Sequence, residues 1–193
     1  MATKKEYPVI TCSNQEEWAA WLQQHHAAED GVWIRIHKKH TGVPSIVYAE
    51  ALDEALCYGW IDGMSKRIDE DTYVQKFTPR RPKSVWSVRN REHIDRLLKA
   101  GKMLPPGLQE VERAKADGRW DDAYSNTKTA ELPDDFLAVL KKNKKATAFY
   151  DTLTKQNKFA IYYRLHTAKK PETRTKRIDT IIAMLEKNEK FYP

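Results

Sequence analysis

The side chains best suited to chemistry are concentrated in residues 55–90 of this chain of 193 residues. Two consecutive arginines can hold a carboxylate or a phosphate through parallel hydrogen bonds. A tryptophan ring nearby can stack on a ligand, and an asparagine can add a hydrogen bond. The members of this candidate anion-binding site are Trp60, Asp62, Arg80, Arg81, Lys83, Trp86 and Asn90.

Two interpretations of this cluster stay open. In the first, the basic residues of a stiff loop between Pro79 and Pro82 bind an anionic ligand, and a tryptophan stacks on it. In the second, Asp62 pairs with an arginine and both tryptophans pack in the core, because ion-pair networks of this kind are often only structural. Both interpretations require a β-hairpin that returns residues 78–81 to a turn at residues 60–63.

Other site chemistries receive less support from residue types and spacing. Cys57 is expected near the C-terminal end of a helix, where the helix dipole opposes a thiolate, so we interpret it as a buried structural cysteine. His37 and His40 have no Cys or carboxylate at a zinc-site spacing. No glycine-rich phosphate-binding motif is present. We therefore expect no metal, no cofactor and no assigned catalytic residue, with Asp62 as the acid–base group if the protein is an enzyme.

Charge is distributed unevenly along the chain. Its net value is +7, but residues 141–193 hold 14 Lys and Arg against 5 Asp and Glu. A local basic stretch, residues 80–102, lies within the nearly neutral remainder. Basic patches attract polyanions, although a lysine-rich surface can also serve solubility alone. An alternative nucleic-acid site consists of Lys169, Lys170, Arg174, Lys176 and Arg177.

The elements that position these side chains follow from hydrophobic periodicity. Residues 9–11, 32–37, 64–68 and 73–78 are expected strands, the last two forming a hairpin. Helices are expected at residues 13–27, capped by Ser13, at residues 48–58 and at residues 84–100. Beyond residue 101 the pattern is helical throughout. The order of elements indicates an α+β fold, with a small antiparallel sheet packed by helices in residues 1–100 and a helical region, residues 101–193, packed on it.

Composition indicates where the protein works. No apolar run approaches the length of a membrane-spanning helix, and no signal peptide is apparent at the N-terminus. Two cysteines do not make a disulfide framework. We therefore expect a cytoplasmic protein without a membrane span.

Several segments resemble the YdeI/OmpD-associated (bacteriocin-protection) family of bacterial proteins. They are residues 55–63, 79–90, 101–120 and 168–178, in family order. The resemblance implies protection against bacteriocins or cationic peptides, and hence a stress-resistance role, but brings no catalytic residues with it. The preferred hypothesis is a non-enzymatic stress-tolerance protein that binds an anionic ligand at the basic loop. The alternatives are an enzyme acting on a small anionic substrate and a nucleic-acid-binding module.

Overall fold

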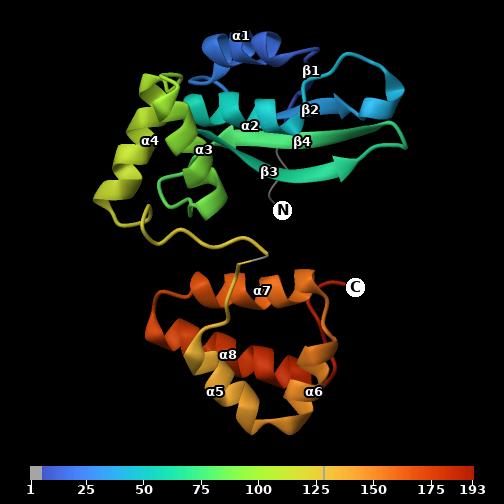
Figure 1. Cartoon of the computed structure of the whole chain (residues 1–193), viewed down its shortest axis with the longest axis vertical. Helices are drawn as coiled ribbons and strands as arrows, with labels where there is room; N and C mark the ends of the chain where they lie inside the picture. The colour runs from blue at the N-terminus through green and yellow to red at the C-terminus, as the bar shows by residue number, and fades with distance from the viewer. Residues whose placement is uncertain (1–5, 128) are drawn as a thin grey trace. The chain divides into compact units, whose positions relative to one another are not determined.

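The computed structural model describes residues 6–127 and 129–193, and the chain forms two compact units (Figure 1). The first unit comprises Met1–Trp86 and Asn90–Asp122, and the second comprises Ser87–Arg89 and Ala123–Pro193. The sequence places a boundary near residue 100, whereas the helix Pro105–Ala116 (α4) belongs to the first unit. That the helical region packs on the first domain stays a prediction.

The first unit is built on a four-stranded sheet with the order β1-β2-β4-β3. Its strands are β1 (Val9–Thr11), β2 (Val32–His37), β3 (Trp60–Arg67) and β4 (Thr72–Pro79). β2, β3 and β4 pair antiparallel, as expected, but β1 runs parallel to β2. The sheet is therefore mixed, and the α+β class is confirmed.

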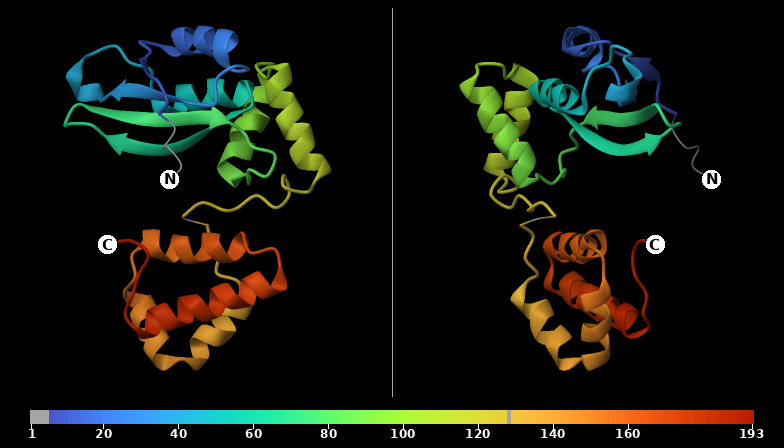
Figure 2. Two further views of the ribbon diagram at one scale, coloured as in Figure 1. Left: turned by 180° about the vertical axis from the view of Figure 1, so that it is seen from behind. Right: turned by 45° about the vertical axis from the view of Figure 1, so that its right-hand side comes forward.

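Helices α1 (Gln15–His25) and α2 (Tyr48–Cys57) pack together beside this sheet, and α4 lies against α2 (Figures 1 and 2). A short 3₁₀ helix, η1 (Lys39–Thr41), follows β2, and α3 (Val88–Lys99) precedes α4. The alternation of residues 32–37 is confirmed by the burial of Val32, Ile34 and Ile36. Trp18 and Leu22 of α1 and Leu52 and Leu56 of α2 are also buried, so both helices contribute apolar side chains to the core of this unit.

Two local expectations were wrong. The cap of α1 is Asn14, whose side chain accepts a hydrogen bond from the Glu17 amide at 2.9 Å. The amide of Ser13 instead donates to Glu17 Oε2 at 2.7 Å, so the chain enters the helix one residue later than expected. Residues 60–63 are the first residues of β3 and not a turn, because Gly59, at φ 74°, already reverses the chain.

The second unit is helical, and its helices are α5 (Asp134–Lys142), α6 (Lys144–Thr152), α7 (Lys155–His166) and α8 (Pro171–Glu186). Its core is formed by apolar residues that recur at helical spacing in all four helices, including Phe136, Leu140, Ala146, Leu165 and Ile178. The buried Asn157 holds the C-terminal segment through its Oδ1, which accepts from the amides of Phe191 and Tyr192 at 3.0 Å. The second unit therefore has a core that is independent of the sheet.

Candidate functional site

The β3–β4 hairpin brings the basic loop to the position expected for it. Trp60 pairs with Pro79 across the two strands, and the Arg80 amide donates to the Gly59 carbonyl at 2.9 Å. The expected return of residues 78–81 to the neighbourhood of Trp60 is therefore confirmed.

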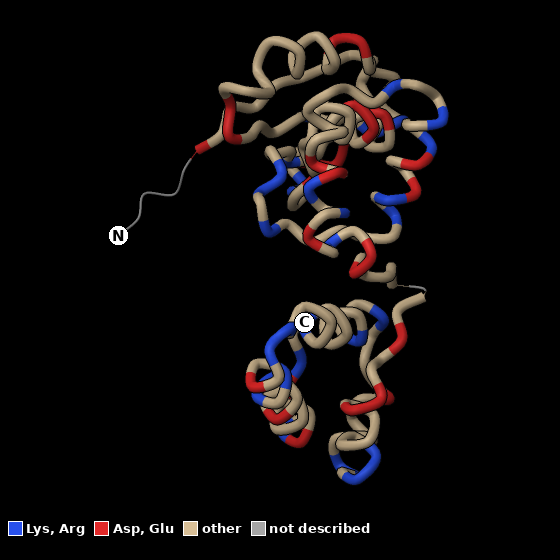
Figure 3. The backbone as a smooth tube through the Cα atoms, turned by 90° about the vertical axis from the view of Figure 1, so that its left-hand side faces the viewer, with Lys and Arg blue, Asp and Glu red and all other residues tan. Residues whose placement is uncertain are grey.

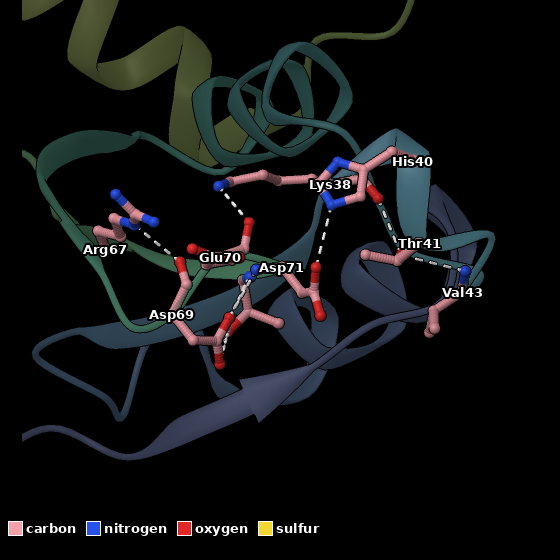
Figure 4. Close-up of polar contacts among 9 residues, drawn as sticks. Lys38, His40, Thr41, Val43, Arg67, Asp69, Glu70 and Asp71 are labelled. Atoms are coloured by element: carbon pink, nitrogen blue, oxygen red, sulfur yellow. Dashed lines mark hydrogen bonds and ion pairs between the residues drawn. The ribbon is translucent and has the colours of Figure 1, made fainter.

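A network of polar contacts closes the far end of the hairpin (Figure 4), beyond a register shift between Asp62 and Ser65 of β3. Asp69 Oδ1 accepts from the amides of Asp71 and Thr72 at 2.8 and 2.6 Å, an Asx-type turn. These hydrogen bonds lower the pKa of the Asp69 carboxyl, and the bond from the Asp71 amide has the largest effect. From the segment after β2, Lys38 donates to the Glu70 carbonyl, and His40 Nε2 lies 3.0 Å from Asp71 Oδ1. The hairpin is thus tied to β2 as well as closed on itself.

Trp60 does not fit the stacking role expected of it, because it is buried, with 1% of its surface exposed. Its ring meets those of Trp18 and Trp21 edge to face, at centroid distances of 6.5 and 5.9 Å. Its Nε1 donates to the His26 carbonyl at 3.2 Å, so the polar edge of the indole is also used internally.

Trp86 is equally buried and is stacked between protein groups. The Arg80 guanidinium carbon lies 3.5 Å from the centre of its ring, and Trp120 meets it edge to face at 4.9 Å. Arg91 in turn lies 5.2 Å from the Trp120 ring centre. Trp86 therefore does not reach a ligand, and the cation–π contact holds the Arg80 guanidinium in one orientation.

The remaining residues of the predicted cluster differ in their partners and in their exposure. Asp62 accepts a hydrogen bond from the Tyr48 hydroxyl at 2.8 Å, and Asn90 is buried. Arg81 and Lys83 are exposed on the loop. Arg80 is 5% exposed, and its Nη1 donates to the Val85 carbonyl at 3.4 Å. Arg80 and Arg81 lie together in the wall of a cavity.

That cavity has a volume of about 380 Å³ and is lined by Tyr7, Asp30, Thr78, Pro79, Arg80, Arg81 and Pro82. Tyr7 and Thr78 contribute hydroxyl groups, and Lys76 Nζ lies 3.9 Å from the centre of the Tyr7 ring. The arginines, the hydroxyls and this lysine can attract and bind an anion, while Asp30 offsets part of the positive charge.

Sequence reasoning missed Tyr7 and Asp30, which reach the cavity through tertiary contacts. Gly31, at φ 154°, lies against the side chains of Tyr7 and Thr78. A Cβ atom at this position would be 2.8 Å from Tyr7 and 2.9 Å from Thr78, which is too close for any residue other than glycine. This approach brings residue 30 next to the end of β4. The only local signal was the glycine itself, and a glycine does not reveal which segments it contacts.

Lys and Arg positions in the second unit occur on several of its segments, with Asp and Glu positions among them (Figure 3). Arg174 pairs with Asp135, with Nη2 2.8 Å from Oδ1, and also donates to the Leu165 carbonyl at 3.0 Å. Arg177 donates to Thr167 Oγ1 at 2.9 Å and to the Arg164 carbonyl. Lys169, Lys170 and Lys176 are exposed. Two of the five predicted nucleic-acid contacts are therefore engaged in holding helices together.

The chain has two cysteines, Cys12 and Cys57. Both Cys12 and Cys57 are free and buried, which confirms the structural interpretation of Cys57. Burial raises the pKa of the Cys57 thiol to about 12 and that of Cys12 to about 11. No three His, Cys, Asp or Glu side chains within residues 6–127 and 129–193 are placed to hold a metal ion.

None of the described helices is both long enough and apolar enough to cross a membrane. No significant match was found among curated proteins or among solved structures.

Two family models match the chain. The first, a domain of unknown function (DUF8412), matches residues 10–110, more than half of the chain. The second, described as bacteriocin-protection, YdeI or OmpD-associated, matches residues 129–188. The expected family resemblance is thus confirmed for the helical unit, while residues 55–63 and 79–90 lie in the DUF8412 match. Residues 129–188 of the helical second unit are similar to the bacteriocin-protection, YdeI or OmpD-associated family, and the chain belongs to the DUF8412 family.

Proposed function

We propose that this protein has a bacteriocin-protection role in the cytoplasm and that it acts by binding a small anion at the Arg80–Arg81 cavity. The role is suggested by the family match of residues 129–188. The compartment is supported by two cysteines that are both free, as expected where thiols stay reduced.

The observation that carries the binding proposal is the cavity of about 380 Å³ with two consecutive arginines in its wall. Arg80 is held in place by Trp86 and by its bond to Val85, so it contributes a fixed positive charge to the cavity wall although little of its side chain is exposed. Pro79 and Pro82 stiffen the loop on both sides. Arg81 is exposed and supplies the accessible charge. Phosphate and carboxylate groups match the planar donor geometry of a guanidinium.

The geometry gives less support to the two alternative functions, an enzyme and a nucleic-acid-binding module. Asp62 would be the acid–base group of an enzyme, but it is bonded to Tyr48 and is not among the residues that line the cavity. A nucleic-acid module would need Arg174 and Arg177, whose donors already bind Asp135 and the end of α7. We therefore propose neither.

The first prediction compares two substitutions in the same loop, R81Q and K83Q, by calorimetric titration with pyrophosphate at low ionic strength. Both remove one exposed positive charge, but only Arg81 lines the cavity. Loss of a hydrogen bond to a charged group costs about 1.5–3 kcal/mol, which corresponds to an affinity at least about tenfold weaker. We expect this loss in R81Q, and K83Q should bind like the wild type.

Equal weakening in both variants would show that pyrophosphate responds only to the diffuse positive potential of the loop. The same two variants should then be compared for survival of the producing bacterium under bacteriocin challenge. Protection that is lost with R81Q and kept with K83Q links the cavity to the role.

A further inference from the structure

A second cavity, of about 410 Å³, lies along one side of α8 in the helical unit. Five residues of α8 line it, at the helical spacing i, i+3, i+4, i+7 and i+8: Thr173, Lys176, Arg177, Thr180 and Ile181. Arg164 of α7 and Phe191 of the C-terminal segment complete the lining. Its volume lies within the range of small-molecule sites.

The three cations of this cavity have no acidic partner. Arg164, Lys176 and Arg177 form no ion pair within the described part of the chain, and no described residue lining the cavity is acidic. Arg174, on the same helix, shows the contrast, because it is paired with Asp135. Three like charges around one cavity repel one another, and a bound anion would relieve that repulsion.

Both arginines are held in place by part of their donor set. Arg177 Nη1 donates to Thr167 Oγ1 and to the Arg164 carbonyl at the C-terminal end of α7. The Arg164 guanidinium lies 3.7 Å from the centre of the Phe191 ring, and its Nη1 donates to the Ala160 carbonyl at 3.1 Å. A guanidinium has five N–H donors, so each arginine keeps further donors for a ligand. The site is thereby ordered before a ligand arrives.

The other wall of the cavity is apolar. Ile181 is 2% exposed and belongs to the helical core, and Phe191 packs against that same core. Because Ile181 is already buried, the apolar surface left open in this wall is mainly that of the half-buried Phe191. A bare inorganic ion would leave that surface uncovered, whereas an aliphatic or aromatic body would bury it. The combination of a cationic rim and an apolar wall therefore selects for an amphipathic ligand.

We propose that the α7–α8 cavity binds a small amphipathic anion, in which a carboxylate or phosphate group sits on Arg164, Lys176 and Arg177 and an apolar body covers Phe191. This site lies in the second unit and is separate from the Arg80–Arg81 cavity of the first. Its ligand chemistry also differs, because the apolar body contributes to binding.

The test is calorimetric titration of the full chain with four probes: octanoate, octyl phosphate, acetate and octylammonium. Saturable binding is expected for octanoate, octyl phosphate or both. Acetate has the negative charge but no long alkyl chain, and octylammonium has the alkyl chain with a positive charge. Neither should therefore bind at the concentrations at which octanoate binds. Octylammonium binding as tight as octanoate binding would overturn the proposal.

Matched variants locate the site. K176Q removes an exposed cation from the cavity, whereas K187Q removes an exposed cation that does not line it. We expect octanoate affinity to fall about tenfold in K176Q, as for the loss of one charge-assisted hydrogen bond, and to stay unchanged in K187Q. Equal affinity in the two variants contradicts the assignment. Arg177 is not chosen because it also holds α7 to α8, so its loss could disturb the fold.

Two further measurements separate the sources of the ligand and the two proposals. In the first measurement, the protein is pelleted with anionic phospholipid vesicles. Pelleting that octanoate reverses would identify a membrane lipid as the ligand. Octanoate binding without pelleting would identify a free amphiphile, and both outcomes support the site. Octanoate binding that survives in R81Q supports a site independent of the Arg80–Arg81 cavity. Loss of octanoate binding in R81Q would contradict it.

Discussion

At the scale of single residues, charge and burial assign different roles to neighbouring side chains. Arg80 and Arg81 are consecutive, yet one is stacked on Trp86 and 5% exposed while the other faces solvent. Arg174 and Lys176 are two residues apart on α8, yet one has a carboxylate partner and the other lines a cavity. A basic residue can bind a ligand only where its donors are not already used inside the protein.

Gly107 gives a prediction at this scale. A Cβ atom at this position would lie 2.4 Å from the Cys57 carbonyl oxygen and 2.6 Å from that of Leu56, so α4 and α2 would have to separate. Alanine in a helix gains up to about 1 kcal/mol over glycine, but a forced shift of packed backbone costs about 1–3 kcal/mol. We expect G107A to lower the free energy of unfolding of the first unit, measured by urea titration.

The matched control is G63A, where a Cβ atom would meet Lys76 Cβ at 3.6 Å, an ordinary contact. This change should be neutral or stabilise by up to about 1 kcal/mol through the unfolded state. A G107A variant as stable as G63A would show that α2 and α4 do not depend on this close approach.

At the scale of elements, the pairing of Asp135 with Arg174 joins the start of α5 to the start of α8. Hydrogen bonds from the Arg174 side chain are the main cause of the lowered pKa of the Asp135 carboxyl. A carboxyl whose pKa is lowered by folding stabilises the protein above its ordinary pKa, and the stabilisation is lost as pH falls through the lowered value. The pair therefore supports the helical unit at neutral pH but not in strong acid.

The corresponding prediction uses D135N with D134N as its control. Both positions lie in the first turn of α5, but within the described part of the chain only Asp135 of the two pairs with Arg174. Asp135 is 45% exposed, so solvent screening limits the pair to about 0.5–1 kcal/mol. Thermal unfolding should show D135N less stable than D134N at pH 7. The difference should shrink as the pH is lowered below about 4, the ordinary aspartate range. A difference that is constant with pH would argue against the ion pair.

At the scale of the whole molecule, the two units have separate cores and match different family models. The core of the second unit comes entirely from α5–α8 and the segments that join them. Asn157 also binds the C-terminal segment without help from outside this unit.

We therefore predict that a fragment of residues 123–193 folds on its own. Its circular dichroism should show helix and a single cooperative thermal transition, at low stability because small domains bury a smaller fraction of their surface. L165A in the same fragment should abolish the transition, since Leu165 is fully buried and its loss costs about 2–5 kcal/mol. A non-cooperative loss of signal in the unsubstituted fragment would contradict this prediction.

The sequence by itself determined the local elements and their order. Alternation in residues 32–37, the helical stripes of Leu52 and Leu56, and the hairpin of β3 and β4 depend on periodicity, which nearby residues carry. It also determined that the basic loop returns to Trp60, because hairpin register follows from the strands themselves. The expected burial of Cys57 is also found in the structure.

Only the tertiary structure decided which of these side chains can meet a ligand. Trp60 and Trp86 became core residues because rings from α1 and residue 120 pack on them, and Asp62 took Tyr48 as its partner. Tyr7 and Asp30 joined the Arg80–Arg81 cavity through a close approach at Gly31. Arg164 and Phe191 completed the α7–α8 cavity from distant positions. The reason is that burial and pairing depend on contacts between segments far apart in the chain, which periodicity and spacing do not specify.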